Sequence, residues 1–173
     1  EQDIAVLDAA DFPRTRDPEG DVITLDGMAL KTAIERVITA SAADDSRPVL
    51  TGCNWRFRDG HITFACADGF RLNVTSLPSD ATGNEIIVPA RALRELAKLL
   101  PSGPVAVYVD EGRRSVWFDM GDTILQSQLI QGVFPNFEQL IPSADSAQVS
   151  VTFDVDELTS ALAGSDKITL TRV

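Results

Sequence analysis

Residues 86–94 read Ile-Ile-Val-Pro-Ala-Arg-Ala-Leu-Arg, which is a short apolar strand, a two-residue break and the start of a helix. Residues 22–31 (Val-Ile-Thr-Leu-Asp-Gly-Met-Ala-Leu-Lys) and 151–158 (Val-Thr-Phe-Asp-Val-Asp-Glu-Leu) have the same pattern. Equivalent helical leucines recur at spacings of 63 and 65 residues: Leu30, Leu93 and Leu158. Recurrence at a nearly fixed period indicates a repeated structural module.

The first repeat continues into a predicted β-hairpin. Residues 50–57 and 61–66 are joined by Asp59-Gly60, a pair that favours a tight type I′ turn. Strand side chains alternate between faces, so this register places three pairs on one buried face: Phe57 with Ile62, Trp55 with Phe64, and Cys53 with Cys66. The other face is expected to be polar and solvated: Asn54, Arg56, Arg58, His61 and Thr63. Both cysteines are expected to be buried thiols, although a cross-strand disulfide is geometrically possible.

The remaining strands complete two similar units. Asp68-Gly69 predicts a turn into a third strand over residues 70–75. In the second unit, strands are expected over residues 105–109, 115–120 and 124–130. Each unit is therefore one strand, one helix and three antiparallel strands. Together they predict one α+β domain over residues 21–142, with two helices packed on antiparallel sheet.

The flanking segments predict pieces of neighbouring domains. Asp11-Phe12-Pro13 resembles Val133-Phe134-Pro135 at the end of the second unit, so residues 1–20 are expected to be the tail of a preceding domain and its linker. Residues 143–173 are expected to be a second linker and the start of a third domain. The chain also begins without Met. It is therefore interpreted as the middle of a longer tandem array.

Composition narrows the class of protein. The chain has 173 residues, of which 44% are hydrophobic, and this composition is typical of a globular protein. Its formal net charge of −11 argues against a protein that coats nucleic acid. No apolar run reaches the roughly 18–20 residues of a membrane span. The chain has two cysteines without metal-site spacing and a single histidine. We therefore expect no metal, no cofactor and a cytoplasmic location.

Four motifs occur in order within this repeat: residues 47–52 (Arg-Pro-Val-Leu-Thr-Gly), 67–72 (Ala-Asp-Gly-Phe-Arg-Leu), 87–93 (Ile-Val-Pro-Ala-Arg-Ala-Leu) and 132–137 (Gly-Val-Phe-Pro-Asn-Phe). Together they resemble the central domain of the bacterial sliding clamp, the beta subunit of DNA polymerase III. The resemblance implies a DNA-clamp fold and a head-to-tail homodimeric ring of three domains per subunit, with helices lining the hole. It implies a non-catalytic processivity factor that encircles double-stranded DNA and tethers the polymerase.

The helix expected over residues 90–100 carries the candidate DNA-binding residues. Its apolar positions share one face, and Arg91, Arg94 and Lys98 form a stripe on the opposite side. The alternative is a solvated helix face in which Arg91 pairs with Glu95. The resemblance, in which this helix faces DNA, favours phosphate contacts without base reading. Lys31 and Arg36 of the first helix are expected to contribute more weakly.

The resemblance also implies a hydrophobic pocket for short peptides of polymerase and clamp-loader subunits. The matching positions are Val49, Leu50, Ala67, Gly69, Phe70, Arg71, Leu72, Pro135, Gln139 and Leu140. The alternative is that these are ordinary core and turn residues. Ala67 stands where the family often has Thr, Phe70 where His is common, and Gln139 where a basic residue is frequent. The pocket is therefore expected to be more apolar than usual.

Other functions find less support in the sequence. His61 lies beside a hairpin turn and is expected to be solvated, and Asp44 and Asp45 are expected to be solvated loop charges. No P-loop or nucleophile motif is present. The rival hypotheses are a stand-alone peptide-binding module without DNA contact and, less well supported, a hydrolase in an unfamiliar α+β fold.

Overall fold

A computed structural model describes residue 8, residues 17–110, residue 112 and residues 114–143, 149 and 151–163. The predicted Asp11-Phe12-Pro13 motif lies outside these residues. The chain divides into two compact units, Glu1–Pro135 and Asn136–Val173, and each is described by itself.

The first unit confirms the predicted order of one strand, one helix and three strands, repeated once. The first repeat is β1 (Asp21–Asp26), α1 (Gly27–Val37), β2 (Gly52–Arg58), β3 (His61–Ala67) and β4 (Leu72–Pro78). The second is β5 (Ile86–Pro89), α2 (Ala90–Leu99), β6 (Pro104–Val109), β7 (Ser115–Asp119) and β8 (Ile124–Gln128). Short 3₁₀ helices η2 (Ile38–Ala40) and η3 (Pro48–Thr51) lie between α1 and β2. The prediction for β4, residues 70–75, begins too early, because Asp68 holds residues 68–71 in a turn.

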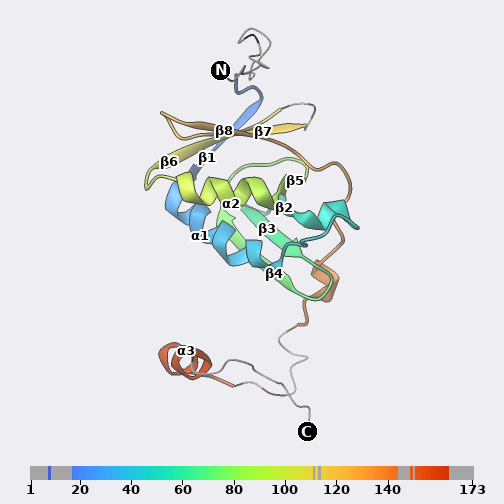
Figure 1. The fold of residues 1–173 in the computed structure, drawn as a ribbon, viewed down its shortest axis with the longest axis vertical. Coiled ribbons are helices and arrows are strands. Elements are labelled where there is room, and N and C mark those ends of the chain that lie inside the picture. The colour runs from blue at the N-terminus through green and yellow to red at the C-terminus, as the bar shows by residue number, and fades with distance from the viewer. Residues whose placement is uncertain are drawn as a thin grey trace, which may run out of the picture. The chain divides into compact units, whose positions relative to one another are not determined.

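The two repeats exchange their first strands. One antiparallel sheet has the order β1-β6-β7-β8 and the other has the order β4-β3-β2-β5 (Figure 1). β1 therefore pairs with the strands of the second repeat, and β5 pairs with those of the first. Neither repeat completes a four-stranded sheet alone, so the two repeats form one structural unit.

The hairpin register follows the prediction. Phe57 lies opposite Ile62 and Trp55 lies opposite Phe64, and the Trp55 and Phe64 rings meet edge to face with centroids 4.7 Å apart. Asp59 and Gly60 both have positive φ, 56° and 71°, as the predicted type I′ turn requires.

The hairpin's second face departs from the prediction. Asn54 is fully buried and Arg56 is 9% exposed, although both were expected on a solvated face. β2 is a central strand, paired with β3 on one side and β5 on the other. Glu85, just before β5, compensates both polar groups: it pairs with the Arg56 guanidinium and accepts a 3.1 Å hydrogen bond from Asn54 Nδ2.

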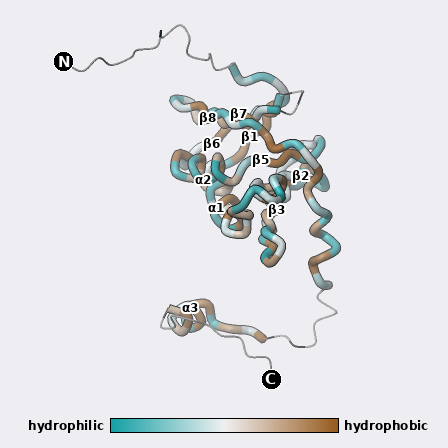
Figure 2. The backbone as a smooth tube through the Cα atoms, turned by 45° about the vertical axis from the view of Figure 1, so that its right-hand side comes forward, coloured by the Kyte–Doolittle hydropathy of each residue, from teal (hydrophilic) through white to brown (hydrophobic). Residues whose placement is uncertain are grey.

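One hydrophobic core joins both sheets and both helices. Leu30 and Ile34 of α1 and Leu93 and Leu96 of α2 are fully buried in this cluster. The helices pack against each other, and Figure 1 shows them side by side. Each helix combines hydrophobic and hydrophilic positions along its length (Figure 2), so one face packs and the other stays exposed.

The N-terminus of α1 shows why Asp26-Gly27 interrupts the strand-to-helix run. Asp26 Oδ1 accepts a 2.8 Å hydrogen bond from the Ala29 backbone N–H and so caps the helix. A Cβ on Gly27 would lie 2.2 Å from the Pro101 carbonyl oxygen. Glycine is needed here because α1 begins against the loop that follows α2.

The second unit contains η4 (Glu138–Leu140) and α3 (Val155–Ala163). The predicted helix at Leu158 is present, and Asp154 Oδ1 accepts hydrogen bonds from the backbone N–H groups of Asp156 and Glu157, both 3.0 Å long. The strand expected over residues 151–153 is not formed. A strand needs a partner for its backbone groups, and the described part of this unit contains no other strand.

Among the residues the structure describes, no helix is both long enough and apolar enough to cross a membrane.

Candidate functional site

The exposed face of α2 carries the predicted basic stripe. Arg91, Arg94 and Lys98 are all exposed, whereas Leu93 and Leu96 on the other side of the helix are fully buried. This separation follows from the 3.6-residue period of the helix. The structure therefore brings the three predicted side chains onto one exposed surface.

The three basic groups differ in their contacts. Lys98 Nζ lies 2.9 and 3.0 Å from the two carboxylate oxygens of Glu95. Arg94 Nη2 donates a 2.8 Å hydrogen bond to the Ser41 hydroxyl, which lies just after η2. Arg91 has no ion pair with any described residue. The Arg91–Glu95 pair of the alternative interpretation is not formed, because Glu95 takes Lys98 at i+3 instead.

The α1 candidates are less clearly arranged. Lys31 is half-buried and Arg36 is exposed next to the exposed Glu35. Arg36 lines a groove of about 320 Å³ between α1 and β4, together with Met28 and Leu77. The structure gives no contact that joins Lys31 or Arg36 to the α2 stripe.

The turn between β3 and β4 is held by a single carboxylate. Asp68 Oδ1 accepts hydrogen bonds from the backbone N–H groups of Phe70 (2.9 Å) and Arg71 (2.8 Å). Asp68 Oδ2 accepts from Arg71 Nε (2.9 Å) and Nη2 (2.7 Å), a two-pronged ion pair. These donors, the Arg71 backbone N–H first, lower the pKa of Asp68 to about 2. The result is a fixed turn with Phe70, 97% exposed, at its tip.

Arg47 ties this turn to η3. Arg47 Nη2 donates to the Asp68 carbonyl oxygen at 3.5 Å. Gly69 has φ +93°, and a Cβ there would lie 2.6 Å from the same guanidinium nitrogen. The left-handed backbone is what favours glycine here, and the absence of a Cβ also leaves room for the flexible end of Arg47.

The other pocket candidates of the first unit lie around η3. Leu50 is only 3% exposed, so its side chain is buried in the core. Val49, Ala67 and Leu72 are half-buried, and Pro135 is exposed. A Cβ on Gly132 would lie 2.7 Å from Val49 Cγ1, so the segment leading to Pro135 passes against η3. Arg47, just before η3, thus contacts the 68–71 turn, and Val49 in η3 lies against Gly132.

The last two pocket candidates belong to the second unit. Gln139 and Leu140 lie in η4 and are exposed, Leu140 by 70%. Sequence reasoning missed Arg47 and Asp68 as the residues that organise this region. The signal for Asp68 was present, since Asp before Gly commonly bonds the backbone two residues ahead. Arg47 had no such local signal, because its contact spans 21 residues of sequence.

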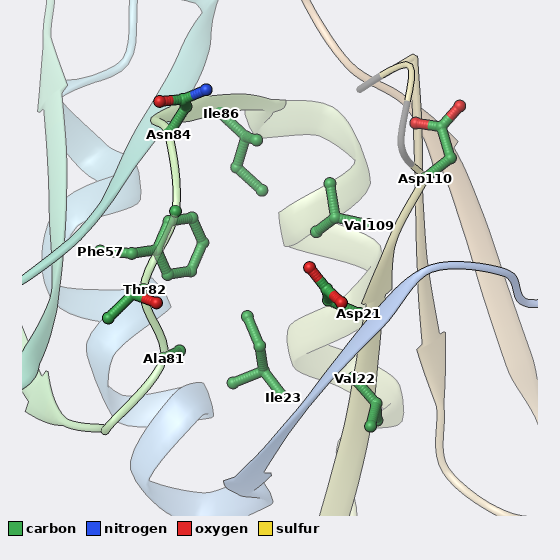
Figure 3. Close-up of a pocket in the computed structure, with 11 residues that line it drawn as sticks. Asp21, Val22, Ile23, Phe57, Ala81, Thr82, Asn84, Ile86, Val109 and Asp110 are labelled. Carbon is green, nitrogen blue, oxygen red and sulfur yellow. The ribbon is translucent and has the colours of Figure 1, made fainter.

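The sequence did not predict the cleft whose lining residues are drawn in Figure 3. Its volume is about 710 Å³. Ile23 and Val109 from one sheet and Phe57 and Ile86 from the other supply apolar walls. Asp21 adds a carboxylate from β1. This cleft shares no lining residue with the α2 stripe or the predicted peptide pocket.

His61 is exposed, as predicted, and its Nδ1 lies 2.9 Å from the Asp59 carbonyl oxygen. Asp44 and Asp45 are exposed loop residues, also as predicted. Within the described part of the chain, no group of three or more His, Cys, Asp or Glu side chains could hold a metal ion.

Comparisons with known proteins place this geometry in context. Residues 24–136 match the family model for the central domain of the DNA polymerase III beta subunit. The chain is 29% identical to the beta sliding clamp of Salmonella typhimurium over 155 residues, covering 88% of this chain and 42% of that protein. It is 30% identical to the Escherichia coli K12 beta sliding clamp over 142 residues, covering 80% and 39%. The chain thus spans about two fifths of the length of these relatives.

Solved structures agree with the sequence comparison. The DNA polymerase sliding clamp of Bacillus subtilis is similar with a TM-score of 0.72 and 27% identity, over 79% of this chain and 37% of that one. The DNA polymerase III beta subunit of Pseudomonas aeruginosa is similar with a TM-score of 0.73 and 28% identity, over 80% and 39%.

Proposed function

This chain belongs to the bacterial beta sliding clamp family, and from that premise we propose that it is the central part of a DNA polymerase processivity factor. In this role it encircles duplex DNA without sequence specificity and tethers the replicative polymerase and other replication partners. Family membership agrees with the expectation that the chain is not an enzyme. A cytoplasmic location belongs to the same proposal.

The observation that carries the DNA-binding part is the exposed basic face of α2. Arg91, Arg94 and Lys98 project from one helix of a chain whose net charge is −11. Basic side chains spaced along a helix contact phosphates without reading base edges, so binding is independent of sequence. Arg94 keeps donors for this role, because only one guanidinium nitrogen is used by Ser41. Lys31 and Arg36 are proposed as weaker contributors.

The ring part of the proposal draws support from the sheet edges. β4 and β8 each lie at the end of their sheet, and neither has a second partner strand among the described residues. Val74 on β4 and Ile124 on β8 are partly exposed. An unpaired, partly apolar edge is a template for another strand. We propose that these edges adjoin neighbouring domains in a closed homodimeric ring.

The domain limits belong to the same proposal. Residues 1–20 are assigned to a preceding clamp domain and its linker, and residues 21–142 to the central clamp domain. Residues 143–173 are assigned to a linker and the start of a third clamp domain.

The partner-binding part centres on the Asp68-held turn. Phe70 offers an exposed aromatic surface, and Arg71 retains free donors beside it. We propose that this turn, with Val49, Ala67, Leu72 and Pro135, supplies one side of a pocket for short peptides of polymerase and clamp-loader subunits. Leu50 supports that wall from the core, and a role of Gln139 and Leu140 in peptide binding stays a prediction of the sequence resemblance.

The DNA proposal is tested by neutralising the stripe in the full-length protein. The triple variant Arg91→Ala, Arg94→Ala, Lys98→Ala is expected to bind duplex DNA more weakly. The slope of log affinity against log salt should fall by about one for each phosphate that a basic side chain no longer neutralises. Fluorescence anisotropy with a labelled duplex, over a series of salt concentrations, measures both quantities.

A matched control removes the same charge elsewhere. The double variant Arg58→Ala, Arg114→Ala changes two exposed residues outside the helices, and it removes the same charge as the stripe variant Arg91→Ala, Arg94→Ala. This control should leave the salt slope nearly unchanged. If the stripe variant and the control behave alike, the stripe does not bind DNA, and a peptide-binding module without DNA contact becomes the better explanation.

A further inference from the structure

Two buried cysteines face each other across the central strand pair of one sheet. Cys53 of β2 and Cys66 of β3 are both fully buried in the hydrophobic core, and both are free thiols. Asn54 lies opposite Ala65 in the antiparallel ladder. One step further along both strands, Cys53 therefore lies opposite Cys66.

The strand register also determines whether Cys53 and Cys66 form a hydrogen-bonded or a non-hydrogen-bonded pair. Arg58 and His61 flank the two-residue turn and form its hydrogen-bonded pair. Hydrogen-bonded and non-hydrogen-bonded pairs alternate along an antiparallel ladder, so Cys53 and Cys66 fall on a non-hydrogen-bonded position. Residues at such positions have Cα atoms about 4.5 Å apart and side chains that approach closely. A disulfide accepts Cα separations of roughly 4.4–6.8 Å.

The surroundings hold both thiols on the same side. The next pair on this face, Trp55 and Phe64, is locked edge to face, so neither strand can slip by one residue without breaking the core. Burial, together with the adjacent Cys66 thiol, raises the pKa of Cys53 well above its usual range. The thiol form of Cys53 therefore predominates, and we expect its oxidation by peroxide to be slow.

We propose that Cys53 and Cys66 are an oxidation site at which a peroxide forms a cross-strand disulfide. The sulfur of one cysteine attacks a peroxide oxygen: an S–O bond forms, the O–O bond breaks, and the departing hydroxide takes the thiol proton as water. The second sulfur then attacks the sulfenic sulfur: the S–S bond forms, the S–O bond breaks, and a second water leaves with the second proton. Two thiols are oxidised and one hydrogen peroxide is reduced to two waters.

The position of the bond gives it a consequence for the peptide pocket. Cys53 lies just after η3, and Cys66 lies two residues before Asp68. A disulfide would fix the spacing between η3, which holds Val49 and Leu50, and the Asp68-held turn, which holds Phe70 and Arg71. This consequence rests on the proposed function, whereas the oxidation site does not.

The test uses hydrogen peroxide on the folded chain, followed by removal of excess peroxide and thiol counting in denaturant. We expect the count to fall from two to zero, the monomer mass to fall by two hydrogens, and a digest to contain one cross-linked peptide pair joining Cys53 and Cys66. Because the readout is mass, it is independent of DNA or peptide binding. Survival of both thiols, sulfinic acids without a cross-link, or intermolecular disulfides alone would overturn the proposal.

Two variants sharpen the result. Cys53→Ala leaves one thiol, which should gain oxygen or survive but form no internal bond. The double variant Ala65→Cys, Cys66→Ala keeps two thiols but moves one to the opposite face of β3, and circular dichroism confirms whether it folds. If this folded variant forms an internal cross-link with a similar yield, then the position of Cys66 opposite Cys53 does not direct the reaction.

Discussion

At the scale of single residues, Asp68 organises more of the candidate peptide pocket than any residue chosen from the sequence. Its carboxylate accepts two backbone and two guanidinium hydrogen bonds, all within one four-residue turn. These donors favour the ionised form, which is why its pKa lies at about 2. The orientation of Phe70 and Arg71 therefore depends on the charge of a neighbouring side chain.

This dependence predicts a change of stability with pH. The pKa of Asp68 is lower in the folded chain than the value near 3.9 expected for an unfolded one. Ionised Asp68 thus stabilises the folded state above about pH 4, and the stabilisation is lost as the pH falls toward 2. Asp68→Asn should be less stable than the parent at pH 7, and the difference should shrink between pH 4 and pH 2. Urea midpoints over this range measure it.

Asp80→Asn is the matched control, because Asp80 is exposed and has no hydrogen bond or ion pair to any described residue. It should not reproduce the loss at pH 7. A constant difference between parent and Asp68→Asn from pH 7 to pH 2 would mean that Asp68 acts by packing, not by charge.

At the scale of elements, the two helices begin differently. α1 has a side-chain cap from Asp26, whereas α2 begins after Pro89 with no side-chain cap. A carboxylate at the N-cap satisfies one of the free backbone N–H groups and interacts favourably with the helix dipole. The start of α1 is therefore the more sensitive to a single substitution.

Asp26→Ala should lower the free energy of unfolding by about 1 kcal/mol, because it removes the hydrogen bond to the Ala29 backbone N–H. Asp26→Asn keeps an oxygen acceptor and should cost much less. Chemical denaturation of both variants gives the two values. Equal losses in the Ala and Asn variants would contradict capping as the cause.

At the scale of the whole molecule, the exchange of β1 and β5 couples the two repeats. Each sheet contains three strands of one repeat and one of the other, and a single core spans both sheets. Unfolding either repeat removes a strand from the other sheet. The first unit is therefore expected to unfold in one step.

The two tryptophans test this cooperativity, because Trp55 lies in one sheet and Trp117 in the other. In Trp117→Phe the fluorescence reports on the β2 sheet, and in Trp55→Phe it reports on the β7 sheet. In each variant the urea midpoint from fluorescence should coincide with that from helical circular dichroism. Separate fluorescence and circular dichroism midpoints in either variant would show that the sheets unfold independently.

The sequence by itself determined the order of elements, the hairpin register and the basic face of α2. These features depend on periodicity, which local chain geometry translates directly into faces and pairs. The turn predicted at Asp59-Gly60 was enough to predict that Trp55 lies opposite Phe64, as the structure confirms. The same reasoning failed for residues 151–153, since an apolar alternation forms a strand only beside a partner.

The tertiary structure alone decided which residues far apart in sequence meet. The packing of the two repeats decides which sheet β1 and β5 join and why Asn54 and Arg56 are buried. It also decides how Arg47 reaches the Asp68 turn. Such contacts are selected by shared burial and by satisfying polar groups across the core, and no local pattern encodes them. The helices could be read from their period, but the surfaces proposed for DNA and peptide exist only because the two repeats complete each other's sheets.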